Sequence, residues 1–233
     1  MPSLIVDTEF GEMVVKRSKR SKGIRIHIGT DGRYVISAPF LAPVAFIKLT
    51  INQSRQELRK LADHSPKATI YQDGQPIGRK HTLAVVRTGM VESPTVKTER
   101  NRLLVLLPPN FSIEQTTTQQ LIRDQVVTIL RAEAKRHLPA MLKDMAQRYG
   151  FSYQRLRFSH SGGRWGSCSS TGTISLNIAL MKLSDDLIYY VLAHELSHTR
   201  QMNHSAAFWR EVSQIDPRYK LHRQQLKRQS PIV

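Results

Sequence analysis

The sequence H-E-L-S-H at residues 194–198 constrains this chain more than any other feature. If this stretch is helical, His194 and His198 lie on one face, with about 6 Å between their Cβ atoms. Two imidazoles in that position can each reach one zinc ion. Glu195 lies one step round the helix, where its carboxylate can contact a water without being a ligand. This pattern is typical of a zinc hydrolase with two His ligands and a Glu general base.

A catalytic zinc site needs a third protein ligand and one open position. His204 is the candidate, because it follows His198 by six residues. On an unbroken helix it would lie about 15 Å along the axis from His194. The helix must therefore end near Arg200 and the chain must turn back. Asn203 favours such a turn because Asn tolerates left-handed backbone, and Ser205 can start a second helix.

Four stretches of the second half together resemble the YgjP-like metallopeptidase family, which is related to the SprT-like and WLM proteases. They are R-W-G-S-C-S (164–169), G-T-I-S-L-N (172–177), Y-Y-V-L-A-H-E-L-S-H (189–198) and N-H-S-A-A-F-W (203–209). The resemblance covers most of the chain and is densest over residues 157–212. It implies that the zinc ligands are His194, His198 and His204, and that Glu195 is the catalytic base.

The resemblance also makes the strand that ends at Asn177 a candidate edge strand, which would pair with an extended substrate through main-chain hydrogen bonds. An ordinary core strand is the alternative. Many relatives have Pro near the start of the H-E-x-x-H helix, where this chain has Ser184, Asp185 and Asp186. Ser and Asp cap a helix start equally well, so this departure changes little.

Hydrophobic periodicity predicts an α+β fold. A β-rich N-terminal region with one helix is expected over residues 1–110, and a helical, zincin-like metallopeptidase domain with a small sheet and the H-E-x-x-H helix over 111–233. The two could also form one continuous unit. Strands are expected at 13–15, 24–28, 34–37, 69–71, 82–87, 95–98, 103–107, 151–160 and 173–178, and helices at 44–62 and 112–149. Pro139 should kink or split the second helix, and Gly150 should end it.

The chain carries 35 Lys and Arg against 18 Asp and Glu, a net charge of +17. This charge favours an anionic partner, with non-specific nucleic acid first and a membrane surface second. A solvated basic surface is the alternative. The basic run of Lys16, Arg17, Lys19, Arg20 and Lys22 suits either a phosphate-binding patch or a charged hairpin edge. No aromatic residue is interleaved there to stack on bases.

One cysteine, Cys168, excludes an internal disulfide and suits a reducing cytoplasm. No signal peptide is visible, and no apolar stretch is long enough to form a transmembrane segment. Packing explains Cys168 better than a nucleophilic role does, because a zinc site already accounts for the His residues. The oligomeric state stays open.

These observations favour a zinc-dependent peptidase that acts on peptides or proteins, with Glu195 as general base. Arg164 or a Tyr such as Tyr189 or Tyr190 could stabilise the oxyanion, and Arg164 and Asn177 are the candidate substrate-binding residues. A metal-dependent nucleotide phosphohydrolase is one alternative. The other is a nucleic-acid-associated protein with a structural zinc, although such a site normally has four protein ligands.

Overall fold

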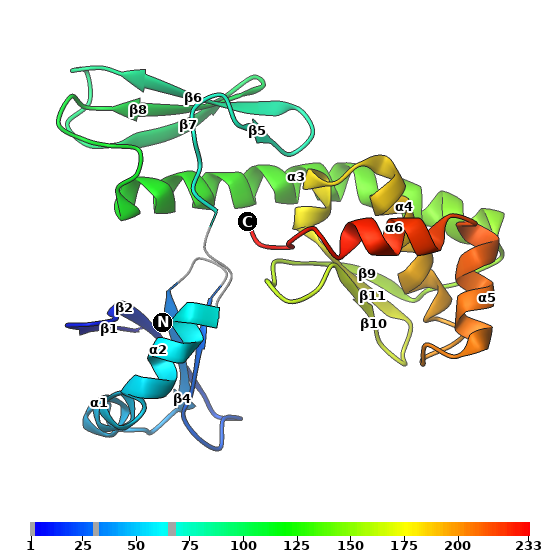
Figure 1. Ribbon diagram of the computed structural model, residues 1–233, viewed down its shortest axis with the longest axis horizontal. Coiled ribbons are helices and arrows are strands. Elements are labelled where there is room, and N and C mark those ends of the chain that lie inside the picture. Colours follow the sequence, from blue (N-terminus) through cyan, green and yellow to red (C-terminus); the bar gives the residue numbers. More distant parts are fainter. Residues whose placement is uncertain (1–2, 30–32, 65–68) are drawn as a thin grey trace. The chain divides into compact units, whose positions relative to one another are not determined.

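The computed structural model describes residues 3–29, 33–64 and 69–233, and it divides into two compact units. Unit 1 comprises residues 1–68 and unit 2 comprises residues 69–233 (Figure 1). The boundary between the units therefore falls after residue 68 in the sequence. The sequence suggested a division after residue 110, or one continuous unit. The mixed α+β character expected from the sequence is confirmed.

Unit 1 is a four-stranded sheet with two helices. Its strand order is β1-β2-β4-β3, in which β2 and β4 are parallel and the other two pairs are antiparallel. Met13, Ile36, Ile47 and Leu58 are among the side chains buried between the sheet and the helices. The elements are β1 (Ser3–Asp7), β2 (Gly11–Ser18), β3 (Arg25–Ile28), β4 (Tyr34–Pro39), α1 (Val44–Gln53) and α2 (Arg55–His64).

The single helix expected over residues 44–62 is two helices, so that prediction was wrong in this detail. Ser54 ends α1, and its backbone N–H donates to the carbonyls of Thr50 and Ile51. The Ser54 carbonyl then accepts from the N–H of Leu58 and so begins α2. Phe46 and Leu61 are exposed, while Ile47 and Ile51 are buried.

The first half of unit 2 is a second four-stranded sheet that packs on one long helix, α3 (Thr116–Arg148). The strand order is β5-β6-β8-β7, and Arg100 makes the turn between β7 and β8 with a φ of 50°. Figure 1 shows this sheet on one side of α3 and the three-stranded sheet of the unit on the other. Its strands are β5 (Pro76–Ile77), β6 (His81–Arg87), β7 (Thr95–Glu99) and β8 (Arg102–Leu107).

The strand expected at residues 69–71 does not form, because α3 takes over its backbone hydrogen bonds. The side chain of Gln119 accepts from the N–H of Tyr71 at 2.8 Å and donates to its carbonyl at 2.9 Å. Arg123 donates to the carbonyl of Thr69 at 3.1 Å. A backbone satisfied in this way needs no neighbouring strand.

Pro139 does not split α3, which continues as one helix from Thr116 to Arg148. Proline removes one helical hydrogen bond. Leu138 and Leu142 on either side are fully buried, so packing holds the helix across this position. The helix begins at Gln115 rather than at Ser112, and its C-cap is Tyr149, followed by Gly150 with a φ of 67°.

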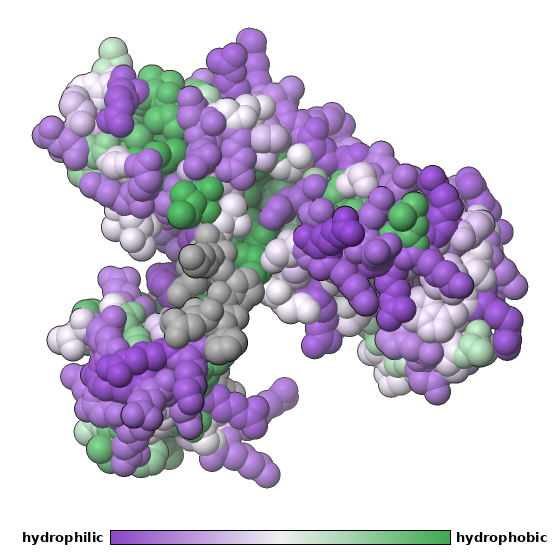
Figure 2. Space-filling model, in the orientation of Figure 1, coloured by the Kyte–Doolittle hydropathy of each residue, from purple (hydrophilic) through white to green (hydrophobic). Residues whose placement is uncertain are grey.

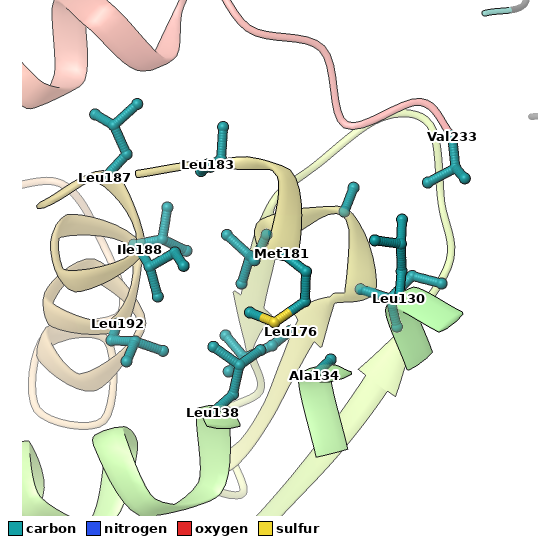
Figure 3. Packing of buried hydrophobic residues seen from close by; sticks show 14 of the residues in the cluster. Leu130, Ala134, Leu138, Leu176, Met181, Leu183, Leu187, Ile188, Leu192 and Val233 are labelled. Atoms are coloured by element: carbon teal, nitrogen blue, oxygen red, sulfur yellow. The ribbon is translucent and has the colours of Figure 1, made fainter. Parts of the chain in front are cut away.

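The second half of unit 2 combines a three-stranded sheet with three short helices and a 3-10 turn. The sheet order is β10-β11-β9, with β9 and β11 parallel. Figure 3 shows Leu138 of α3 facing Leu176 and Met181, with Ile188 and Leu192 of the neighbouring helix on the same core. The elements are β9 (Arg155–Ser159), β10 (Gly166–Cys168), β11 (Thr173–Asn177), η1 (Ile178–Lys182), α4 (Asp185–Ser197), α5 (Ala206–Ile215) and α6 (Tyr219–Leu226).

Across the described ranges, no helix combines the length and the hydrophobicity that crossing a membrane would require.

Candidate metal centre

Helix α4 places His194 and Glu195 in its last turn and ends at its C-cap residue, His198. Asp185 and Asp186 stand in its first turn, where their negative charges favour the helix dipole. Leu192, Ala193 and Leu196 are fully buried, so the apolar side of α4 is fixed in the core of unit 2. The opposite side carries the two imidazoles.

A turn after α4 brings His204 back to the same place. The N–H groups of Thr199, Arg200 and Gln201 bond to the carbonyls of Leu196 and Ser197, which ends the helix within one turn of His198. Ser205 is the N-cap of α5 and accepts from the N–H of Phe208 at 3.4 Å, as the sequence predicted. Asn203 does not have a positive φ, so the expectation of a left-handed turn at that residue was wrong.

The three imidazoles meet through their Nε2 atoms. The Nε2 atoms of His194 and His198 are 3.2 Å apart, and those of His194 and His204 are also 3.2 Å apart. Two nitrogens bound tetrahedrally at 2.0–2.1 Å to one zinc ion would be about 3.3 Å apart. One ligand atom from each of the three residues lies within 4.8 Å of the others. The donor set therefore fits a metal ion held by three nitrogens with a position left open.

The protonation of these rings also suits metal binding. Nδ1 of His198 lies 3.0 Å from the carbonyl of Gln201. A carbonyl only accepts, so Nδ1 carries the proton and Nε2 keeps its free lone pair. Burial, followed by the neighbouring His198 and His204, lowers the pKa of His194 to about 3. Its ring is therefore neutral over the range in which proteins work.

Aromatic side chains of α5 form one wall of the site. Phe208 is fully buried, and its ring centroid lies 4.5–4.9 Å from those of the three imidazoles. Trp209 stacks on His204 at 5.7 Å and on Tyr219 at 5.3 Å. The guanidinium of Arg223 lies 4.8 Å from the Trp209 ring. These contacts fix the imidazole orientations before any ligand binds.

Glu195 is buried beside the imidazoles, with 4% of its surface exposed. Its Oε2 atom is buried and has no hydrogen-bond partner among the described residues. Burial raises the pKa of Glu195 to about 8, against the opposing charge of Arg164. A carboxyl of this kind takes up and releases a proton near neutral pH.

Gly166 of β10 makes the position of Glu195 possible. A Cβ atom at residue 166 would lie 2.5 Å from Oε1 and 2.7 Å from Cδ of Glu195. Only glycine allows the strand and the carboxyl to approach so closely. The sequence reasoning missed this residue, although a Gly between Trp165 and Ser167 in a short strand is a known signal of close approach.

A cavity of about 190 Å³ opens beside His194 and Glu195. Its wall includes Trp165 and Gly166 of the β10 region and apolar side chains of α4 and α6. The lining residues are Trp165, Gly166, Tyr190, Val191, His194, Glu195 and Leu226. Strand β10 lies at the edge of its sheet, so an edge strand runs along this cavity.

The interpretation of the strand ending at Asn177 as that edge was wrong, because β11 lies between β9 and β10. Asn177 is fully buried. Its side-chain amide donates to the carbonyls of Ser161 at 2.6 Å and Arg164 at 2.9 Å, and its oxygen accepts from the N–H of Ala179. The first two bonds hold the loop before β10 and the third caps η1, so Asn177 positions the loop.

The remaining candidates divide between the site and its surroundings. Arg164 is exposed, and its charge acts on Glu195. Tyr190 lines the cavity, and burial raises its pKa to about 12, so its hydroxyl stays protonated. Tyr189 is outside the cavity lining and its hydroxyl contacts that of Tyr149 at 3.2 Å. Burial raises the pKa of Cys168, which makes it a poor nucleophile.

A family model of the YgjP-like metallopeptidase domain matches residues 22–229, which is most of the chain and includes every residue of the site. The chain belongs to the YgjP-like metallopeptidase family. The resemblance seen in the sequence is thereby confirmed, and membership implies a hydrolase that depends on a metal ion and acts on peptides or proteins.

Two solved structures of metallopeptidase zymogens are similar to part of this YgjP-like chain. One is abylysin of Pyrococcus abyssi, with 28% identity over 38% of this chain and 90% of that chain, and a TM-score of 0.36. The other is jannalysin of Methanocaldococcus jannaschii, with 18% identity over 37% of this chain and 93% of that chain, and a TM-score of 0.32. No curated protein matches the chain.

Proposed function

We propose that this YgjP-like protein is a zinc-dependent peptidase of the H-E-x-x-H type. The observation that carries the proposal is the meeting of three imidazole Nε2 atoms beside a buried carboxyl. His194, His198 and His204 would hold the ion. Zinc, when bound, supplies a Lewis acid that polarises a scissile carbonyl and makes water a stronger acid.

The chain's own groups would carry the proton. The Glu195 carboxylate accepts a proton from the attacking water and passes it to the leaving amine nitrogen. Its Oε2 atom has no hydrogen-bond partner within the part of the chain that the structure describes, which leaves it available for this exchange. Because Gly166 has no side chain, it leaves room for the carboxyl beside the strand. The protonated hydroxyl of Tyr190 lines the cavity and is the candidate donor to the oxyanion, with Arg164 as the second candidate.

The substrate would bind as an added strand. β10 is an edge strand, and two residues of this region, Trp165 and Gly166, line the cavity. An extended peptide that pairs with β10 gains main-chain hydrogen bonds and brings its backbone past Glu195. Asn177 supports this arrangement indirectly, because it ties down the loop that leads into β10.

The two alternatives have less support. A nucleotide phosphohydrolase needs cations against the phosphates, yet the described cavity lining contains no Lys or Arg. A structural zinc site is normally closed by four protein ligands, and the group described here offers three. A peptide substrate suits a cavity lined by Trp165, Val191 and Leu226.

The variant Glu195→Gln tests the proposal. The amide is nearly isosteric with the carboxyl but cannot accept a proton, so casein cleavage should fall about 100- to 10,000-fold. Elemental analysis should still find one zinc per chain, and a chelator should abolish cleavage by the unmodified protein. Cleavage by Glu195→Gln at the unmodified rate would contradict the general-base role. A purified, active protein that contains no zinc would contradict the choice of metal.

A further inference from the structure

The outer side of α1 is apolar, and no other described segment of unit 1 covers it. Ile47 and Ile51 are buried against the sheet, as expected for the inner side of a helix. Phe46 and Leu49 point the other way and are 55% and 50% exposed. A helix on the surface of a globular protein normally carries polar residues there. The connection before α1 adds Phe40 and Leu41, which are 54% and 87% exposed.

The basic run of β2 and the loop after it lies against this apolar segment. β2 pairs in parallel with β4, so Arg17 is opposite Ala38 and the two strands end side by side. The Arg17 guanidinium donates to the carbonyl of Phe40 at 3.2 Å and also to that of Ala42. The Lys19 ammonium lies 6.0 Å from the centroid of the Phe40 ring. Cations and apolar side chains therefore form one surface, which we call the α1 surface. It consists of Arg17, Lys19, Phe40, Leu41, Phe46 and Leu49, and Arg20 and Lys22 follow Lys19 in the same exposed loop.

The charge around the α1 surface is of one sign. Residues 13–29 and 33–53 contain eight Lys and Arg and no Asp or Glu. Among the acidic residues of unit 1, Asp7 and Glu9 are paired with Arg55 and Arg59, and Glu12 lies at the opposite end of β2 from Arg17. Figure 2 shows hydrophobic residues at the surface around α1, beside hydrophilic ones. The surface therefore attracts anions and at the same time exposes side chains that water solvates poorly.

We propose that the α1 surface binds peripherally to an anionic lipid bilayer. Apolar side chains that enter the headgroup boundary, together with a polybasic patch, are the two signals that such binding needs. Nucleic acid fits the cations but gains little from Leu41 and Leu49, since stacking on bases requires aromatic faces. A second copy of the chain would bring two basic surfaces together. An anionic bilayer offers negative headgroups to the cations and an apolar interior to the apolar side chains.

Vesicle flotation of the full chain tests the proposal. At about 50 mM salt the protein should float with phosphatidylcholine vesicles that contain about one third phosphatidylglycerol, and not with pure phosphatidylcholine. The variant Phe40→Ser with Leu41→Ser should bind at least about tenfold more weakly. Neutralising Lys19, Arg20 and Lys22 to Gln should weaken binding about 100-fold.

Two variants with matched changes elsewhere serve as controls. The first control removes the same number of positive charges from the exposed side of α3, by changing Lys135, Arg136 and Lys143 to Gln. The second removes two exposed apolar side chains of unit 2, by Ile70→Ser with Met90→Ser. Both should bind vesicles like the unmodified protein. Circular dichroism and zinc content should be unchanged in every variant, because the altered side chains are exposed or distant in sequence from the His residues.

Other outcomes identify other occupants and would overturn the proposal. Equal binding to neutral vesicles, or no binding to anionic ones, would show that the α1 surface does not recognise an anionic bilayer. Vesicle binding that is unchanged in Phe40→Ser with Leu41→Ser removes the role of the apolar side chains. Binding of a single-stranded DNA oligonucleotide at lower concentration than anionic lipid assigns the cations to nucleic acid. A dimer that dissociates in Phe46→Ser with Leu49→Ser assigns the apolar side of α1 to a second copy.

Discussion

At the scale of single residues, the candidate site depends on a few close approaches between side chains and backbone. Glu195 lies against the backbone of Gly166, and the three imidazoles lie against Phe208. The carboxyl must remain close to the imidazoles while one of its oxygens stays free. A displacement of about 1 Å in such a site can cost a factor of 100 in rate.

Gly166→Ala tests this dependence. The new methyl group would lie 2.5 Å from Oε1 of Glu195, so the carboxyl must move. We expect kcat for peptide cleavage to fall about 100-fold, with zinc content and fold retained. Gly163→Ala is the matched control, because a Cβ there meets no atom within 4 Å. A Gly166→Ala protein with unchanged kcat would show that Glu195 tolerates displacement.

At the scale of elements, loops hold the site as firmly as helices do. α4 ends within a turn of His198, and α5 begins at Ser205, so the short connection between them places His204. The loop before β10 is held by Asn177, whose amide reaches the carbonyls of Ser161 and Arg164. Bonds from one buried side chain therefore fix the loop that carries Arg164 and leads into the edge strand.

Asn177→Ala should loosen this loop. The change removes three hydrogen bonds and leaves buried backbone groups without partners, so the free energy of unfolding should fall by about 2–4 kcal/mol. Urea denaturation followed by tryptophan fluorescence measures this loss, because Trp165 lies directly after the loop. Asn110→Ala, at an exposed position, should change the stability little. Equal stability of the two variants would mean that other contacts hold the loop.

At the scale of the whole molecule, the two compact units have separate hydrophobic cores. Both tryptophans, Trp165 and Trp209, belong to unit 2. Tryptophan fluorescence therefore reports the unfolding of unit 2, whereas circular dichroism reports both units. Unit 1 carries its own exposed ionic network, in which Arg55 and Arg59 bind Asp7 and Glu9.

Acid should weaken unit 1 through this network. The hydrogen bond from Arg59, with help from Arg55, holds the pKa of Glu9 below its usual value of 4.5. Because the folded-state pKa is lowered, the stabilisation is complete above pH 4.5 and is lost as the pH falls through the lower, folded value. The thermal transition seen by circular dichroism alone should therefore shift down below about pH 4.5.

Arg59→Gln distinguishes this cause from general acid effects. Without the hydrogen bond, the pKa of Glu9 should return toward its usual value, so the acid-dependent shift in unit 1 should be smaller. Arg25→Gln removes an exposed charge from the same unit and should keep the full shift. An identical pH dependence in Arg59→Gln and in the unmodified protein would remove Glu9 as its source.

Local patterns in the sequence determined several features on their own. Residues four apart lie on one face of any α-helix, so the approach of His194 to His198 was predictable. Ser205 is a common N-cap residue, so the start of α5 was predictable as well. The turn at Arg100 and Asn101 and the long helix that ends before Gly150 have local signals as well. Their physics involves residues close together in the chain, which a single sequence displays directly.

Only the tertiary structure decided which distant segments meet. The parallel pairing of β9 with β11, the capture of the Tyr71 backbone by Gln119 and the contact of Gly166 with Glu195 each join residues at least 18 positions apart. The proximity of Lys19 and Phe40 is of the same kind. Strand order and side-chain contact depend on which packing buries most apolar surface and satisfies most backbone groups, and this comparison involves the whole chain.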